Sequence, residues 1–105
     1  YLKCLFFFLI LLFHDNNLKR ICNLDVKISN IGFEELQEFK IFNKHKIPLL
    51  SEALNTWSNV YFNIEPKSKQ SAYLLLDELK KQKNLNRFCV GSFRPENLNI
   101  IRDGD

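Results

Sequence analysis

Ionisable and hydroxyl side chains stand where three apolar stretches of this sequence end. They are His14 and Asp15 after the first stretch, Glu65 and Lys67 after the second, and Ser92 near the end of the third. A carboxylate can hold a hard cation, an ammonium can neutralise an anion, and an imidazole can act as acid or base near neutral pH. In parallel α/β folds the active site lies at the carboxyl ends of the strands. We therefore take these residues as the candidate site.

The second of these places is the most informative. Asn63, Glu65 and Lys67 share one face of an extended chain because strand side chains alternate, although Pro66 bends the backbone before Lys67. A carboxylate and an ammonium on the inner face of a strand are costly unless they pair or bind an ion. Two interpretations stay open. One is a structural ion pair. In the other, Glu65 is an oxygen ligand for Mg²⁺ or Ca²⁺ and Lys67 lies near an anionic substrate.

The two histidines differ in their surroundings. His14 ends an apolar run and precedes Asp15, which suits either a turn residue or a proton-transferring group. His45 lies between two lysines in a predicted loop, where we expect it to be solvated.

The elements that must position these side chains follow from periodicity, cap and turn signals. The sequence predicts helices over 33–39 and 50–57, a strand over 60–65, a helix over 69–83 capped by Ser68, a strand over 87–93 and a helix beginning at Pro95. The buried helix faces are predicted to include Trp57 on the second helix and Tyr73, Leu75, Leu76 and Leu79 on the third.

The stretch from Val60 to Arg87 is close to the roughly 30 residues of a βαβ unit. Alternating strands and helices indicate the α/β class, with a parallel sheet and helices outside it. Three strands cannot complete a doubly wound sheet or a barrel, so we expect part of such an architecture.

Residues 4–13 form a run of consecutive apolar side chains. The run is too short to span a bilayer as a helix, which takes about 20 residues. A fully buried strand is the favoured interpretation. A membrane-directed segment and sequence unrelated to the parent fold remain as alternatives.

Composition excludes several classes of protein. The 105 residues are 46% hydrophobic with a net charge of +3, which is typical of one globular domain and not of a disordered chain. Basic residues are interleaved with acidic ones, so nucleic-acid binding is not supported. The three cysteines have neither zinc-site nor disulfide spacing. The sequence has no Met and begins at Tyr1, and we interpret it as a piece of a longer protein.

Five groups of residues together resemble a known family. They are His14-Asp15 with Leu18 and Arg20 following, Lys27-Ile28-Ser29 before Phe33-Glu34-Glu35-Leu36, residues 47–54, Asn63-Ile64-Glu65-Pro66-Lys67, and Gly91-Ser92-Phe93. In this order and spacing, residues 13–105 are similar to the middle of a glycerophosphodiester phosphodiesterase domain. That resemblance implies a partial TIM barrel, with about three of the eight parallel strands and incomplete at both ends. The implied organisation is an apolar segment, 1–13, followed by a partial phosphodiesterase-like domain, 14–105.

The resemblance also implies a chemistry. Members of the family hydrolyse glycerophosphodiesters, small molecules of lipid metabolism, to an alcohol and glycerol 3-phosphate with a divalent cation, Mg²⁺ or Ca²⁺, and two histidines. By this resemblance His14 matches the second, catalytic histidine, Glu65 a metal ligand, and Lys67 the substrate-binding lysine beside the phosphate.

The sequence also departs from the family. The first histidine, its His-Arg-Gly motif and two acidic metal ligands are absent, so we expect these 105 residues to be inactive alone. The alternatives are a non-catalytic α/β remnant, a chain that contacts a membrane through residues 4–13, which is less favoured, and another TIM-barrel metal hydrolase. The oligomeric state stays open, as does the compartment, for which the cytoplasm is slightly favoured.

Overall fold

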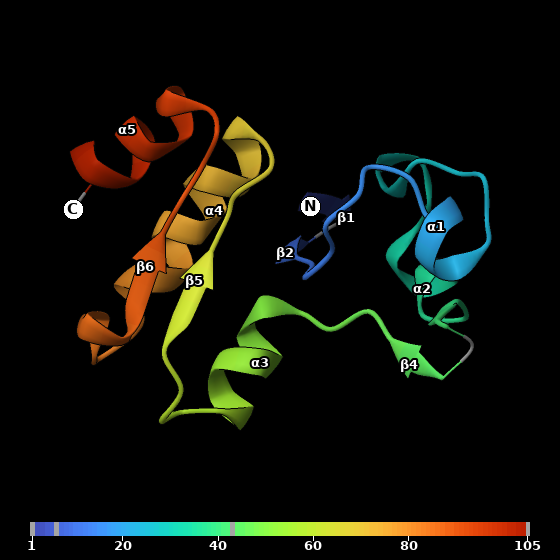
Figure 1. The fold of residues 1–105 in the computed structure, drawn as a ribbon, viewed down its shortest axis with the longest axis horizontal. Coiled ribbons are helices and arrows are strands. Elements are labelled where there is room, and N and C mark those ends of the chain that lie inside the picture. The colour runs from blue at the N-terminus through green and yellow to red at the C-terminus, as the bar shows by residue number, and fades with distance from the viewer. Residues whose placement is uncertain (1, 6, 43, 105) are drawn as a thin grey trace. The chain divides into compact units, whose positions relative to one another are not determined.

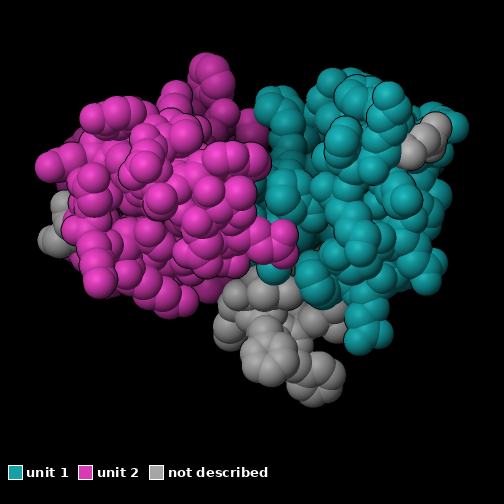
Figure 2. Space-filling model, turned by 90° about the horizontal axis from the view of Figure 1, so that it is seen from below, with its two compact units in different colours: residues 1–50 teal, residues 51–105 magenta. Residues whose placement is uncertain are grey.

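A computed structural model describes residues 2–5, 7–42 and 44–104. The chain divides into two units, residues 1–50 and residues 51–105, which are coloured separately in Figure 2. In chain order the first unit contains β1 (Leu2–Leu5), β2 (Phe7–Ile10), α1 (Lys19–Cys22), the 3₁₀ turn η1 (Ile28–Asn30), α2 (Phe33–Leu36), β3 (Lys40–Ile41) and β4 (His45–Lys46). The rest of the chain forms α3 (Leu50–Thr56), β5 (Phe62–Ile64), α4 (Lys69–Lys80), the 3₁₀ turn η2 (Leu85–Arg87), β6 (Phe88–Val90) and α5 (Pro95–Asp103), as Figure 1 shows for the labelled elements.

The apolar run near the start of the chain is extended, as predicted, but it is not one strand. β1 and β2 pair antiparallel, with Leu2 opposite Ile10 and Leu5 opposite Phe7. The single-strand prediction is wrong because an uninterrupted apolar run carries neither a turn signal nor an alternation that could set its register. The sequence also predicted that the side chains of residues 4–9 are buried, but these side chains are outside those that the structure describes. After the hairpin, Leu11 and Phe13 are buried.

The first unit has its own hydrophobic core. Its buried members are Leu11, Phe13, Leu18, Ile28, Ile31, Leu36 and Ile47. α2 is shorter than the helix predicted over 33–39, since only Phe33–Leu36 is α-helical. In the next turn the backbone hydrogen bonds are of the 3₁₀ type, between residues three apart. Glu38 N–H donates to the Glu35 carbonyl, and Phe39 N–H donates to the Leu36 carbonyl.

The second unit contains the predicted βαβ arrangement. β5 and β6 are parallel, with Phe62 opposite Phe88 and Ile64 opposite Val90, and α4 connects them (Figure 1). The Gly91 N–H continues the ladder to the Ile64 carbonyl at 3.0 Å. The chain is therefore of the α/β class.

α4 begins where the sequence predicts. The Ser68 hydroxyl accepts from Ser71 N–H at 3.1 Å and Ser68 N–H donates to Ser71 Oγ at 2.9 Å, a reciprocal cap. The helix ends at Lys80, three residues earlier than predicted.

Two aromatic residues were wrongly assigned to buried faces. Tyr73 is 58% exposed. The buried face of α4 contains Ala72, Leu75 and Leu79, and successive helix residues are about 100° apart, so the residue after Ala72 points away from that face. Trp57 is 55% exposed; it follows the last residue of α3, Thr56, and its N–H still donates to the Ala53 carbonyl at 3.0 Å.

Arg87 is a buried cation that the sequence did not reveal. Its guanidinium donates to the carbonyls of Leu54 at 3.2 Å and Trp57 at 2.9 Å, at the end of α3, and lies over the Phe88 ring at 4.6 Å. Carbonyls at the end of a helix lack intrahelical partners, and the negative end of the helix dipole favours a cation. Arg87 therefore joins α3 to β6.

Within the part of the chain that the structure describes, no helix is both long and apolar enough to cross a membrane.

Candidate functional site

A cleft of about 420 Å³ opens at the carboxyl ends of the parallel strands β5 and β6. The side chains and backbone that line it are Asn63, Glu65, Gly91, Ser92 and Phe93. Glu65 and Ser92 were predicted from the ends of apolar stretches, and both lie at this cleft. Phe93 is 95% exposed, so its ring is available to a bound molecule. A Cβ at Gly91 would lie 3.7 Å from Asn63 Oδ1, an ordinary van der Waals contact, so a small side chain would fit at this position.

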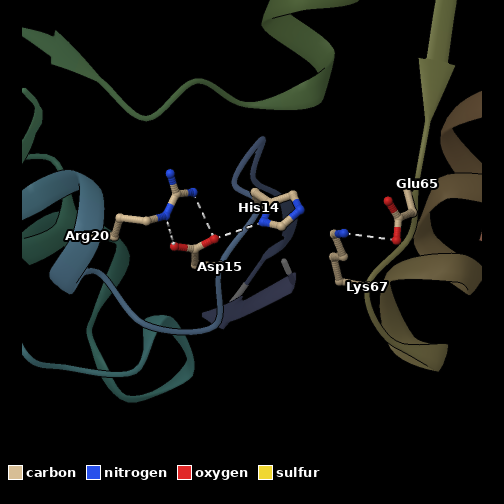
Figure 3. A network of polar contacts seen from close by, with 5 residues as sticks. All are labelled: His14, Asp15, Arg20, Glu65 and Lys67. Atoms are coloured by element: carbon tan, nitrogen blue, oxygen red, sulfur yellow. Dashed lines mark hydrogen bonds and ion pairs between the residues drawn. The ribbon is translucent and has the colours of Figure 1, made fainter. Parts of the chain in front are cut away.

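Glu65 and Lys67 form an ion pair beside this cleft (Figure 3). The distance from Lys67 Nζ to Glu65 Oε1 is 2.8 Å, and the side chains are 19% and 35% exposed. The buried Pro66 between them accepts a hydrogen bond from Asn97 Nδ2 of α5 at 3.2 Å, which anchors the turn. The structural ion pair that the sequence left open is therefore present, and of its two members Glu65 lines the cleft.

A divalent cation would need more ligands than these residues offer. Ca²⁺ and Mg²⁺ take about six or more oxygen ligands in total, and carboxylates are the usual protein anchors. Across residues 2–5, 7–42 and 44–104, no three His, Cys, Asp or Glu side chains come together as a metal-binding group. The described residues therefore do not form a complete metal site, and Glu65 fits at most one of its ligands.

The other predicted site residue, His14, belongs to a second polar group, in the unit of residues 1–50. His14 Nδ1 lies 2.8 Å from Asp15 Oδ1 (Figure 3). Arg20 from α1 donates to the same carboxylate through Nε at 2.8 Å and Nη2 at 3.0 Å. The sequence prediction included Arg20, five residues after Asp15, among the residues of the family resemblance, but it assigned no contact between the two side chains.

These contacts lower the pKa of the Asp15 carboxyl well below its ordinary value of 3.8, chiefly through the hydrogen bonds from Arg20 and then through that from His14. The same pairing raises the pKa of Arg20. Asp15 is therefore ionised and Arg20 charged throughout the neutral range, so the pair remains intact there.

Asp15 should make unfolding depend on pH in the acid range. Because its pKa is lower in the folded state than in the unfolded state, its stabilisation is fully present above pH 3.8 and is lost as the pH falls below that value. We expect the unfolding midpoints of the wild type and Asp15→Ala to converge as the pH falls from 5 towards 2, measured by urea titration. A difference that stays constant over this range would contradict the assignment, and Asp25→Ala serves as the control.

The structure thus brings Glu65 together with Lys67, and His14 together with Asp15. The two groups lie in different units of the chain.

Many α/β enzymes have, like this chain, a cleft lined by an ionisable side chain at the carboxyl ends of parallel strands. The particular relationship comes from a solved structure. The chain is similar to the crystal structure of a glycerophosphodiester phosphodiesterase from Thermotoga maritima, with 34% sequence identity and a TM-score of 0.68. The match covers 90% of this chain and 39% of that one. No family model and no curated protein matches the chain. The resemblance inferred from the sequence is confirmed: this is a glycerophosphodiester phosphodiesterase-like chain, spanning 39% of the length of its solved neighbour.

Proposed function

We propose that this chain is part of a phosphodiesterase that hydrolyses glycerophosphodiesters to an alcohol and glycerol 3-phosphate with the help of a divalent cation. The observation that carries the proposal is the similarity to a solved glycerophosphodiester phosphodiesterase over 90% of the chain. The cleft beside the Glu65–Lys67 pair supports it, because a phosphodiester is a small anion and a lysine can neutralise its charge.

Each of the three predicted site residues has a role in this proposal. Lys67 binds a phosphate oxygen, with Glu65 holding its ammonium in place. His14 exchanges a proton with the attacking or the leaving oxygen. Glu65 is one oxygen ligand of Mg²⁺ or Ca²⁺, and the remaining ligands come from outside these 105 residues. A bound cation would supply charge neutralisation at the phosphate.

We further propose that the parent fold is a TIM barrel, of which this chain supplies a part. The parallel pair β5 and β6, joined through α4 and followed by α5, is the repeating unit of such a barrel. The antiparallel pair β1 and β2 does not follow the barrel pattern, which supports setting the first part of segment 1–13 apart from the phosphodiesterase-like residues 14–105. Leu11 and Phe13, at the end of that segment, pack in the core of the first unit and do not support the division there.

The 105 residues alone are expected to be inactive, because their described side chains do not complete a metal site. The test compares this chain with the longer protein that would carry the missing ligands. Both are incubated with glycerophosphocholine and Mg²⁺ or Ca²⁺, and released glycerol 3-phosphate is measured. We expect release by the longer protein, its loss with EDTA, and none by the 105-residue chain. A folded, metal-loaded longer protein that cleaves no glycerophosphodiester would refute the function. Metal-dependent release by the 105-residue chain would refute its inactivity.

A further inference from the structure

Asp15 and His14 form one polar contact but differ strongly in their exposure to solvent. The side chain of Asp15 is 23% exposed, whereas the neighbouring imidazole of His14 is 72% exposed. Asp15 Oδ1 accepts from both His14 Nδ1 and Arg20 Nη2, and Oδ2 accepts from Arg20 Nε. A carboxylate held at both oxygens by a planar guanidinium has little freedom to rotate. An anchored carboxylate therefore holds an imidazole that projects towards solvent.

The support for Arg20 is itself anchored. Arg20 lies in the single turn of α1, and the residue before that turn, Leu18, is fully buried in the core of the first unit. Asn17 Oδ1 accepts from Lys19 N–H at 2.7 Å at the start of this turn. Core packing and a local cap thus hold the backbone that carries Arg20, and the position of its Cα atom is fixed relative to Asp15.

The hydrogen-bonding capacity of the groups determines where the proton lies. An ionised carboxylate offers only acceptors, so a nitrogen that bonds to it must carry a hydrogen. Nδ1 of His14 is therefore the donor to Asp15. In the neutral imidazole the lone pair then lies on Nε2, the nitrogen on the far side of the ring from Asp15.

We propose that Asp15, held by Arg20, is a positioning residue that fixes His14 as its Nδ1–H tautomer and leaves Nε2 to exchange a proton with the substrate. One proton moves in each step. Nε2 takes it from the attacking oxygen or returns it to the leaving oxygen, while the Nδ1 proton stays in its bond to Asp15. The catalytic meaning rests on the proposed function, but the tautomer does not.

The tautomer can be measured directly on the ¹⁵N-labelled 105-residue chain. Long-range ¹H–¹⁵N correlation spectra, recorded where His14 is neutral, report which ring nitrogen carries hydrogen. We expect Nδ1–H to be the majority neutral form of His14 in the wild type. It should lose that majority in Asp15→Ala and keep it in the matched control Asp77→Ala, which removes an exposed carboxylate from α4 in the other unit. His45, in β4, gives an internal reference that should not respond to either change.

The outcomes separate the two proposals. A wild-type majority of Nε2–H would overturn the positioning role, and so would an unchanged tautomer in a folded Asp15→Ala variant. If Asp15→Ala fails to fold, the wild-type spectrum still decides. Absence of glycerophosphodiester hydrolysis in the longer protein would refute the function and leave these spectra unaffected.

Discussion

Replacing Arg87 with methionine is expected to lower the free energy of unfolding by about 3 kcal/mol. The arginine is 8% exposed, and its guanidinium donates to carbonyls of Leu54 and Trp57 and to Gln82 Oε1. It also lies over the rings of Phe62 and Phe88. Methionine retains much of the apolar stem but no donors, so the end of α3 loses its partners and the aromatic pair loses its cation. Urea unfolding of the purified chain measures the change.

Two variants make this expectation specific. Arg87→Lys keeps the charge but not the planar fork, so it should recover only part of the loss. Arg94→Met is the matched control, because Arg94 is exposed before α5 and makes no side-chain cap, and its effect should stay within about 0.5 kcal/mol. Equal destabilisation by Arg87→Met and Arg94→Met would show that the buried contacts of Arg87 do not contribute to the free energy of unfolding.

Replacing His14 with alanine is expected to lower kcat for glycerophosphodiester hydrolysis by about 10²- to 10⁴-fold in the longer, active protein. This is the usual cost of losing one general acid or base, and it follows if His14 moves the proton in the rate-limiting step. KM should change much less, because in the proposed function Lys67 and the cation, and not His14, neutralise the charge of the substrate. Initial rates of glycerol 3-phosphate release over a range of substrate concentrations give both constants.

The chain carries its own control for this experiment. His45 is also exposed, but it lies in β4, where it stands opposite Ile41. His45→Ala should therefore leave kcat unchanged while removing the same side-chain type. If both histidine variants lose activity equally, the loss reports on folding and not on proton transfer, and the role of His14 fails.

Much of the second unit could be predicted from sequence because its signals are local. Ser68 caps the helix that follows it, and the spacing of apolar side chains predicts α4 and its strands. Glu65 and Ser92 could be placed at one end of a sheet, since successive parallel strands must point the same way. These features depend on a few neighbouring residues or on the rules of strand connection.

The sequence by itself therefore determined the α/β class, the βαβ unit and the family resemblance. Only the tertiary structure decided that the apolar run forms a hairpin, that Arg87 is buried, and that Arg20 holds Asp15. Arg87 contacts Leu54 from 33 positions away, and no local spacing encodes a contact of that range. Periodicity and caps express the conformation of one segment, whereas burial and hydrogen-bond partners depend on which segments pack together.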